Sequence, residues 1–363
     1  MEPSDAPQIL QLAKHSVGHS VYGSQWVPAS ARFVAYGSRT KGTGSLLIGE
    51  VLGRSTQTNA DIELPTGIRC GTFGASGLAD RQLALGDFDG NISVHDVDVT
   101  DKENAGVSWS IKGHSGVVNC IDGCVGSSAG PGSPEIVTGG RDGAVRVWDT
   151  RKKDAPVCAF VGSSEGSQRD CWSVALGNSV TSEERVVAAG YDNGDIKVFD
   201  LRKNSVKHSV NVGNGVCDLQ FDRKEIAMNK LAASCLESMM HVFDMRTLHP
   251  TRGYAQLAEQ APGSATAWSI RHLPQNREVI AVLAGSGDVF LYRYHYPDQR
   301  RVTDSEGKHA GVAGSLEKVG EKQVAEQPIG SLDWSPDKLG LAVCTSFDQA
   351  VRVLAITKLD KLR

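Results

Sequence analysis

Gly140-Arg141-Asp142-Gly143-Ala144-Val145-Arg146-Val147-Trp148-Asp149 is the stretch that decides the fold. It joins an Asp-Gly turn to a run of alternating apolar and polar residues that ends in an aromatic residue and an aspartate. Asp-Gly between alternating runs is typical of a tight antiparallel hairpin, because glycine readily adopts positive φ. Clear copies of this signature end at Asp96, Asp149 and Asp200, and weaker copies end at Glu50, Asp244, Arg293 and Ala355. The chain therefore contains seven such units.

A second pattern lies upstream of every signature and marks a candidate innermost strand. It consists of an apolar residue, two variable residues, an apolar residue, one variable residue and usually a large apolar or aromatic residue, at 21–26, 68–73, 118–123, 171–176, 216–221, 267–272 and 329–334. The signatures end about 45 to 60 residues apart, the length of a WD-type repeat with loop insertions. We therefore predict an all-β fold, a seven-bladed WD-repeat β-propeller.

The two ends of the chain are expected to close the ring. The last repeat ends soon after Ala355, which leaves little room for an outer strand, whereas residues 7–14 (PQILQLAK) have the pattern of one. Pairing of these ends would leave no large unpaired edge in the last blade. Residues 299–327 are a long insertion between blades six and seven, and part of it should supply the sixth outer strand. We expect residues 1–363 to form a single propeller domain.

Composition narrows the classes of partner and the location. The 38 Lys and Arg residues against 42 Asp and Glu give a net charge of −4, without the positive field that attracts nucleic acid. No segment has the roughly 18 consecutive apolar residues of a membrane span, and the first residues do not resemble a secretory leader. The eight cysteines include no CxxC pair. We expect a monomer of the cytosol or nucleus, with reduced cysteines and no nucleic-acid or membrane partner.

The third repeat has the fullest set of polar signature residues, namely His114, Thr138, Asp142 and Trp148. An imidazole, a hydroxyl, a carboxylate and an indole N–H can form one buried chain of hydrogen bonds. The set resembles a Ser-His-Asp triad in composition only, and we interpret it as a structural network. The sequence has no GxxxxGK[ST], HExxH or GxSxG motif and no paired Cys or His spacing for zinc. We therefore predict no enzyme activity, no cofactor and no metal site.

Three positions in each WD-type blade are expected to face one surface around the central channel: the second residue of the inner strand, the residue two before it, and the residue before the turn aspartate. Aromatic residues and arginine, which are enriched in interface hot spots, dominate these positions here. The inner-strand positions also include Asn119, Cys217 and Gly330. The predicted partner-binding residues are Tyr22, Arg69, Phe88, Arg141, Asp170, Trp172, Tyr191, Trp268 and Phe347. The alternative is that some of them pack inside the channel or against neighbouring blades.

Two other binding functions remain open at this point. Trp148-Asp149-Thr150-Arg151 matches the WDxR pattern of propellers that act as substrate receptors of cullin-type ubiquitin ligases, and 199–202 and 243–246 are near copies. An arginine at this place is also common in WD repeats without that role. The channel aromatics could instead form a cage for methyl-lysine in a histone-peptide reader.

Several stretches outside the generic repeat resemble the Monad family of WD-repeat proteins. They include Arg169-Asp170-Cys171-Trp172, His272-Leu273-Pro274-Gln275-Asn276-Arg277 and, within the insertion, Asp304-Ser305-Glu306-Gly307. The resemblance covers nearly the whole chain. It implies a cytoplasmic adaptor that associates with RuvB-like ATPases and a prefoldin-like co-chaperone assembly. In organisms with motile cilia it implies a role in the preassembly of axonemal dynein arms. It implies no catalytic residues.

Overall fold

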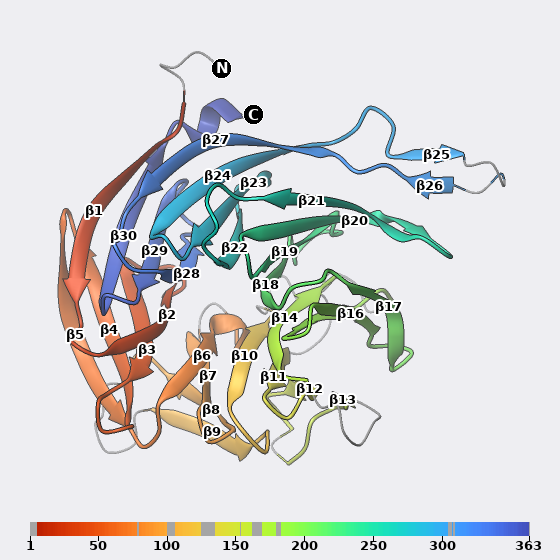
Figure 1. Ribbon diagram of the computed structural model, residues 1–363. Coiled ribbons are helices and arrows are strands. Elements are labelled where there is room, and N and C mark those ends of the chain that lie inside the picture. Colours follow the sequence, from red (N-terminus) through yellow and green to blue (C-terminus); the bar gives the residue numbers. More distant parts are fainter. Residues whose placement is uncertain are drawn as a thin grey trace.

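Seven four-stranded antiparallel sheets are arranged around a central axis in the computed structural model of the chain (Figure 1). The structure describes residues 6–77, 80–99, 106–124, 135–152, 154–161, 169–178, 183–303, 307 and 309–362. The innermost strands of the seven blades lie around the centre of Figure 1 and contact their neighbours around the ring. The predicted fold, an all-β propeller with seven blades, is confirmed.

The first five blades follow one another along the chain, each from its inner to its outer strand. Blade 1 consists of β2 (Ser20–Trp26), β3 (Arg32–Ser38), β4 (Gly44–Leu52) and β5 (Ser55–Leu64). Blade 2 consists of β6 (Ile68–Thr72), β7 (Gln82–Asp87), β8 (Asn91–Asp96) and β9 (Val107–Lys112). Blade 3 consists of β10 (Val118–Gly123), β11 (Glu135–Gly140), β12 (Val145–Asp149) and β13 (Cys158–Phe160). Blade 4 consists of β14 (Cys171–Gly177), β15 (Val186–Tyr191), β16 (Asp195–Asp200) and β17 (Ser205–Asn211). Blade 5 consists of β18 (Val216–Phe221), β19 (Lys230–Cys235), β20 (Met239–His249) and β21 (Gly253–Gln260).

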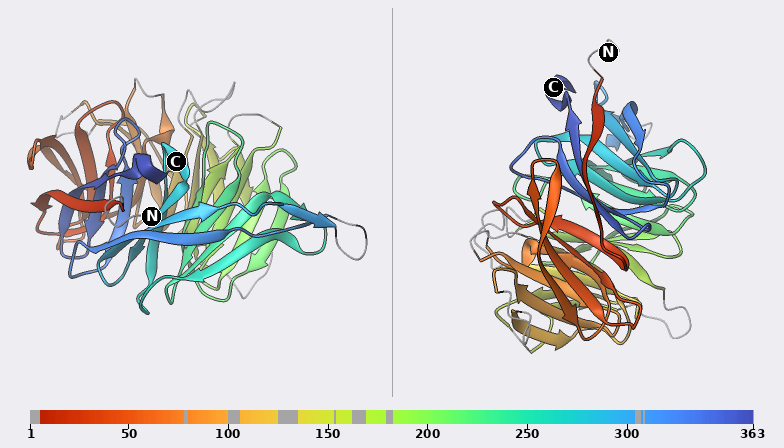
Figure 2. Two further views of the ribbon diagram at one scale, coloured as in Figure 1. Left: turned by 90° about the horizontal axis from the view of Figure 1, so that it is seen from above. Right: turned by 90° about the vertical axis from the view of Figure 1, so that its left-hand side faces the viewer.

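The last two blades depart from this simple order. Blade 6 consists of β22 (Ala267–Leu273), β23 (Asn276–Ala284), β24 (Asp288–His295) and β27 (Ser315–Gln323). Between β24 and β27 the chain forms a separate hairpin of β25 (Arg301–Thr303) and β26 (His309–Gly311), which projects from the body of the propeller (Figures 1 and 2). Blade 7 consists of β28 (Ile329–Trp334), β29 (Leu341–Ser346), β30 (Ala350–Thr357) and, as its outer strand, β1 (Gln8–Ser16). Two short 3-10 helices, η2 (Phe73–Ala75) and η3 (Leu359–Leu362), lie outside the sheets.

Closure of the ring rests on the pairing of β1 with β30. The two strands pair antiparallel along their whole length, from Gln8 opposite Thr357 to Ser16 opposite Ala350. Figure 2 shows β1 lying along the outer side of the last blade. The predicted closure by the N-terminal strand is thus confirmed, and the outer edge of β30 is not exposed.

The hydrophobic core is divided into seven clusters, each lying between two adjacent blades. Strand residues alternate between the two faces of a sheet, so each blade supplies one set of side chains to the preceding seam and another to the following seam. Trp148 and Ile92 meet in this way between blades 2 and 3. No single blade encloses a core of its own, so the stability of each blade depends on its neighbours.

Side chains also cross the seams near the centre. Asp333 in β28 accepts a hydrogen bond from the backbone N–H of Trp26 in β2 at 2.8 Å. Asp122 in β10 accepts one from the N–H of Leu176 in β14 at 2.9 Å. These carboxylates satisfy backbone donors that face the neighbouring blade instead of a paired strand. They therefore fix each inner strand relative to the next.

The first prediction concerns closure of the ring. Ile9 in β1 is 4% exposed within the cluster between blades 6 and 7, whereas its neighbour Leu10 is 43% exposed. Ile9→Ala should lower the free energy of unfolding by about 2 kcal/mol or more, because it leaves a cavity at the closing strand. Leu10→Ala is the matched control and should change it by less than about 0.5 kcal/mol. Deletion of residues 1–14 should lower the melting temperature sharply. Equal effects of the two alanine variants in thermal and denaturant unfolding would contradict this account.

The second prediction is a pH dependence that comes from Asp333. Burial raises the pKa of Asp333 to about 6, against the opposing hydrogen bond from Trp26. Between pH ~4 and ~6 the folded protein therefore binds more protons here than the unfolded chain, and this stabilisation is lost as the pH rises through 6. Asp333→Asn keeps an acceptor oxygen but is neutral at every pH. Relative to the wild type, the variant should gain stability from pH 4 to pH 8, by about 2 kcal/mol. Denaturant unfolding at both pH values measures this difference, and a pH-independent difference would exclude it.

Candidate interaction surface

Every inner strand has a β-bulge at the same place. The register slips between the first and third residues of six inner strands, and between the second and fourth residues, Val21 and Gly23, of the longer β2. A bulge leaves one residue outside the ladder and redirects its side chain. The unpaired residues are Tyr22, Arg69, Asn119, Trp172, Cys217, Trp268 and Gly330, the inner-strand positions predicted from the sequence. The bulge gives these positions a common physical cause.

A backbone hydrogen bond brings a turn residue beside each bulge in six of the blades. The N–H of Phe88 donates to the carbonyl of Gly67 at 3.0 Å, and the N–H of Phe347 donates to that of Pro328 at 2.9 Å. Arg141 makes the same bond to Val117 in blade 3. The residue between the second and third strands thus lies next to the start of the inner strand. We call the bulged residues and these turn residues, together with Asp170, the rim.

Tyr191 does not occupy the turn position of the rim. It pairs with Cys171 within the β14–β15 ladder, as Asp87 pairs with Ile68 in blade 2. The bond to the carbonyl before the inner strand is made by the next residue, Asp192. A shift of one residue moves a side chain to the other face of a strand, and Tyr191 is accordingly only 7% exposed in the core between blades 3 and 4. We therefore leave Tyr191 out of the rim.

Tyr22, Arg69 and Phe88 come together at the seam of blades 1 and 2. The rings of Tyr22 and Phe88 meet edge to face with centroids 5.5 Å apart, and the guanidinium of Arg69 lies over the Tyr22 ring at 5.5 Å. Both geometries are attractive, because the positive edge of a ring or a cation approaches the negative face of another ring. All three side chains are partly exposed. The result is a partly exposed aromatic cluster held in a defined geometry.

Trp268 and Phe347 form a second aromatic cluster at the seam of blades 6 and 7. Their ring centroids are 5.7 Å apart, and Phe347 is 49% exposed. Two glycines lie beside them: a Cβ atom at Gly330 would lie 3.0 Å from the Phe347 ring, and one at Gly285 would lie 3.4 Å from the indole nitrogen of Trp268. The small neighbours leave room beside the rings. This is the most exposed apolar part of the rim.

Arg141, Asp170 and Trp172 lie between these clusters on the ring. Arg141 and Asp170 form a long ion pair of 4.0 Å across the seam of blades 3 and 4. Burial raises the pKa of Asp170, Asp192 raises it further, and Arg141 opposes the change. Trp172 packs beside Gly215 of blade 5, where an added Cβ would lie 2.7 Å from its ring. The rim residues therefore contact partners across the seams, and they do not converge on one pocket.

The four polar signature residues of the third repeat form a continuous chain of hydrogen bonds. His114 Nδ1 lies 2.8 Å from Asp142 Oδ1, and His114 Nε2 lies 2.8 Å from Thr138 Oγ1. The indole N–H of Trp148 donates to the same hydroxyl at 2.9 Å. Burial raises the pKa of Asp142, but the hydrogen bonds from His114 and Arg146 have the larger combined effect. The pKa of Asp142 is therefore held below its ordinary range. His114, Thr138 and Trp148 are at most 2% exposed, so none of them is available to a substrate.

Sequence reasoning missed Arg146 in this network. Its guanidinium donates to Asp142 Oδ2 at 2.9 Å and also contacts His114. The spacing of four residues around the Asp-Gly turn places Arg146 opposite Thr138 on the adjacent strand, which a hairpin register could have shown. Arg352 and Asp348 form a comparable i, i+4 pair in blade 7. The repeat thus uses an arginine to neutralise the turn aspartate.

The third prediction tests the network. Thr138→Val preserves the shape of the side chain but removes the hydroxyl, which leaves the buried nitrogens of His114 and Trp148 without their partner. The free energy of unfolding should fall by about 1 to 3 kcal/mol. Thr138→Ser keeps the hydroxyl and is the control. Its free energy of unfolding should fall by less than that of Thr138→Val. Denaturant unfolding of both variants gives the comparison, and a loss in Thr138→Val no larger than that in Thr138→Ser would show that the hydroxyl does not decide the stability.

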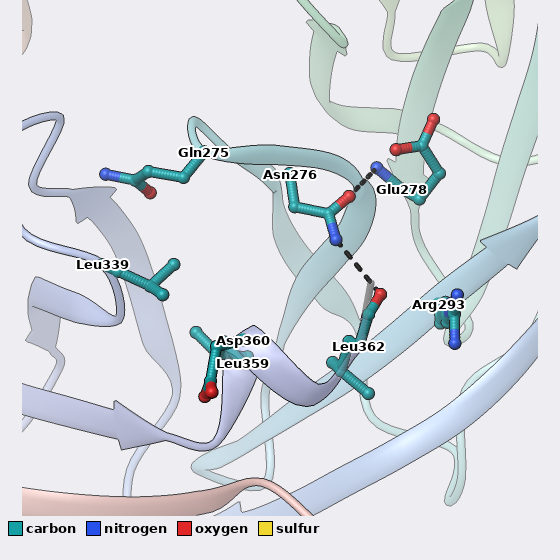
Figure 3. A pocket seen from close by; sticks show the side chains of 8 residues that line it. All are labelled: Gln275, Asn276, Glu278, Arg293, Leu339, Leu359, Asp360 and Leu362. Carbon is teal, nitrogen blue, oxygen red and sulfur yellow. Dashed lines mark hydrogen bonds between the residues drawn. The ribbon is translucent and has the colours of Figure 1, made fainter.

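A surface hollow of about 450 Å³ lies between blades 6 and 7 (Figure 3). Gln275, Asn276 and Glu278 line one side, and η3 lines the other. Figure 3 shows the amide of Asn276 directed at the end of η3, where it donates to the carbonyl of Leu362 at 3.3 Å. The hollow forms where η3 packs on blade 6. None of the residues that line it is among the partner-binding residues predicted from the sequence.

Two searches of the described ranges bear on other kinds of site. Within these ranges, no group of three or more His, Cys, Asp or Glu side chains is arranged to hold a metal ion. None of the helices in this part of the chain combines the length and the apolar character needed to cross a membrane.

Comparison with known proteins identifies the repeat and the family. The model of the WD domain, G-beta repeat, matches residues 107–149, which run from β9 through β12 and contain the whole His114 network. Dynein axonemal assembly factor 10 of Chlamydomonas reinhardtii is 50% identical over 362 residues and covers 100% of both chains. The chain belongs to the dynein axonemal assembly factor 10 family. The human member is 49% identical over 362 residues, again across 100% of both chains. The Dictyostelium discoideum member is 25% identical over 92% of this chain and 91% of its own.

Membership of this family confirms the resemblance noted in the sequence. The similarity to the Chlamydomonas and human members extends over the insertion as well as the repeats, since it covers the full length of the chains. Family and fold together make the exposed rim, and not a catalytic centre, the leading candidate for a functional surface.

Proposed function

We propose that this protein is a non-catalytic assembly factor for axonemal dynein that holds partner proteins on its rim. The observation that carries the proposal is the full-length identity of about 50% with relatives that are named dynein axonemal assembly factor 10. Proteins that are this similar over their whole length share their fold. We also infer that the whole chain acts as one domain, because its two ends share blade 7.

The composition of the rim supports a role in protein binding. Tyr, Trp, Phe and Arg side chains bury a large area for few lost rotamers, and they dominate the binding energy of protein interfaces. Trp268 and Phe347 supply an exposed apolar cluster. Tyr22, Arg69 and Phe88 supply a second aromatic cluster, which carries the positive charge of Arg69. Contacts across the seams fix these side chains before a partner arrives, which reduces the entropic cost of binding.

The proposed partners follow from the family. They are axonemal dynein chains as clients, and RuvB-like ATPases with a prefoldin-like co-chaperone assembly as the machinery that processes them. The cytoplasm is the compartment in which such preassembly would take place, with the protein acting as a monomer. The rim offers two separate aromatic clusters, which suits a scaffold that contacts more than one partner segment.

The two alternative functions gain no specific support from the contacts. The guanidinium of Arg151 in the WDxR stretch binds Asp149 of its own turn at 3.0 Å, which gives this motif a local structural role. The ring of Tyr22 already has the Arg69 guanidinium over it and is in edge-to-face contact with Phe88, and the other rim aromatics, Trp172, Trp268 and Phe347, lie at other seams. We therefore prefer the assembly factor to a ubiquitin ligase receptor or a methyl-lysine reader.

The fourth prediction tests the rim as the binding surface. Tagged wild-type protein recovered from ciliated cells should carry dynein chains and RuvB-like ATPases, identified by mass spectrometry. The double variant Trp268→Ala, Phe347→Ala should bind at least one of them about thirtyfold more weakly and recover correspondingly less of it, because truncation of a hot-spot aromatic costs about 2 kcal/mol. Leu52→Ala is the control, since Leu52 on blade 1 is 49% exposed, as is Phe347.

Two results would count against the proposal. Recovery of neither dynein chains nor co-chaperone components with the wild-type protein would remove the function itself. Unchanged recovery with the double variant, when thermal unfolding shows that both proteins are folded, would exclude the rim as the binding surface. The proposed function would then have to use another face of the propeller.

A further inference from the structure

Exposed basic residues collect at the turns between the third and outer strands of blades 3 to 5. The third strands of blades 3 and 4 end in an aspartate, and that of blade 5 contains one, Asp244. Each aspartate is followed two residues later by an arginine, namely Arg151, Arg202 and Arg246. Further cations follow in the same turns, and the insertion of blade 6 adds another. All seven are exposed, and we call them the basic band: Arg151, Lys152, Arg202, Lys203, Arg246, Arg252 and Arg301.

The carboxylates that precede these cations are already satisfied. Asp200 accepts the backbone N–H groups of Arg202 and Lys203, both at 3.0 Å. Asp244 is fully buried and binds Arg300 of the insertion through two hydrogen bonds of 2.6 and 2.8 Å. Arg300 thereby takes the place at Asp244 that Arg151 takes at Asp149 in blade 3. Arg300 thus neutralises the charge of Asp244, and Arg246 remains exposed.

Contacts between neighbouring blades make the basic band continuous. Cys158 in β13 donates to Asn204 in the turn of blade 4 at 2.9 Å. The rings of His208 in β17 and Tyr254 in β21 meet with centroids 5.0 Å apart. Arg301 of the insertion donates to the carbonyl of Arg246. Figure 1 shows the β20–β21 and β25–β26 hairpins projecting side by side from this part of the ring, and the two hairpins are in contact.

A buried cluster fixes the base of the projecting insertion. Arg300 lies over the ring of Tyr296 at 4.9 Å, and the hydroxyl of Tyr296 accepts a hydrogen bond of 2.6 Å from Lys230 in β19. Burial lowers the pKa of Lys230, while Asp222 and Glu278 oppose the change. These contacts tie the insertion of blade 6 to blade 5, so the cations on either side of the seam keep a defined spacing.

Exposed apolar side chains alternate with the cations of the basic band. Val157, Val206, Leu248 and Val302 are 44%, 52%, 43% and 44% exposed. At blade 3 a shallow hollow of about 820 Å³ is lined by Arg151, Lys152 and Val157, among others. The exposed acidic residues nearby are fewer than the seven cations: Asp154, which lines this hollow, Asp298, and Glu183 and Glu184, which precede Arg185, whose carbonyl accepts the N–H of Leu201 at the blade 4 turn. This pattern contrasts with the net charge of −4 of the whole chain.

We propose that the basic band is a second docking surface, and that it binds an acidic, extended segment of a partner protein that also carries apolar side chains. Cations at successive turns attract a segment with repeated carboxylates, and the valines and the leucine between them offer apolar contacts that a phosphate backbone would not use. Turns before and after the third strand lie at opposite ends of that strand. The basic band and the rim are therefore on opposite faces, and one protein can hold two partners at once.

The test uses the full-length protein and a fluorescein-labelled synthetic peptide in which the triplet Glu-Glu-Leu is repeated. Fluorescence anisotropy should show binding that weakens as the salt concentration rises. The variant Arg202→Glu, Lys203→Glu, Arg246→Glu, Arg252→Glu should raise the Kd by about tenfold or more, because four attractive contacts become repulsive. The control variant reverses four exposed cations of blades 1, 6 and 7: Lys41→Glu, Arg54→Glu, Lys322→Glu and Lys338→Glu. It has the same net charge and should bind like the wild type.

Three further arms separate this inference from the alternatives. A poly-Glu peptide without leucine should bind more weakly, and Trp268→Ala, Phe347→Ala should bind the peptide like the wild type, which keeps the result independent of the rim. An equal loss in the band and control variants would reduce the effect to net charge and overturn the proposal. Tighter binding of poly-uridine RNA or of phosphatidylserine vesicles than of the peptide, lost in the band variant, would also overturn it by assigning the surface to nucleic acid or lipid.

Discussion

Antiparallel pairing of β1 with β30 is the constraint on which the rest of the molecule depends. The core consists of seven clusters, each shared by two blades, so the loss of one seam would leave apolar faces open on both sides. The seams on both sides of blade 7 are complete only when β1 lies on that blade, since Ile9 packs in the cluster between blades 6 and 7 and Ala13 in the cluster between blades 7 and 1. The exposed rim and the turns opposite to it keep their spacing because the ring cannot open. Closure is thus a condition for any binding surface that spans several blades.

The periodic part of this architecture can be predicted from the sequence. Alternating runs, Asp-Gly turns and the apolar pattern of the inner strands give the bounds of β10, β18 and β28 without the structure. They do so because strand periodicity and tight turns are local properties of the chain. The second residue of each predicted inner strand was expected to face the channel surface, but the β-bulge at that residue appears only in the structure. Tyr191 marks the limit of this reasoning, because Asn193 and not Asp192 occupies the turn position that Asp89 has in blade 2, so Asp192 takes the rim position.

Contacts between distant parts of the chain could not be predicted in the same way. Arg300 and Asp244 are 56 residues apart, and nothing near either residue indicates that one binds the other. The same holds for Lys230 with Tyr296 and for Asp333 with Trp26, which meet because the ring brings their blades together. The basic residues after Asp149, Asp200 and Asp244 are visible in the sequence, but their exposure and continuity depend on which side chains neutralise the aspartates. Local patterns therefore predict the scaffold, and only the assembled ring shows which charges remain available.

The order of strands in blade 7 also has a consequence for biosynthesis. β1 leaves the ribosome first and its partner β30 leaves last, so the first strand waits while more than 300 residues are translated. At ordinary elongation rates this interval is on the order of tens of seconds. During that time the apolar side of β1 and the open face of blade 1 have no native partner, and both are able to associate with other nascent chains. An assembly factor of this family therefore passes through an aggregation-prone state during its own synthesis. Its cellular yield depends on how well β1 is shielded until β30 is made.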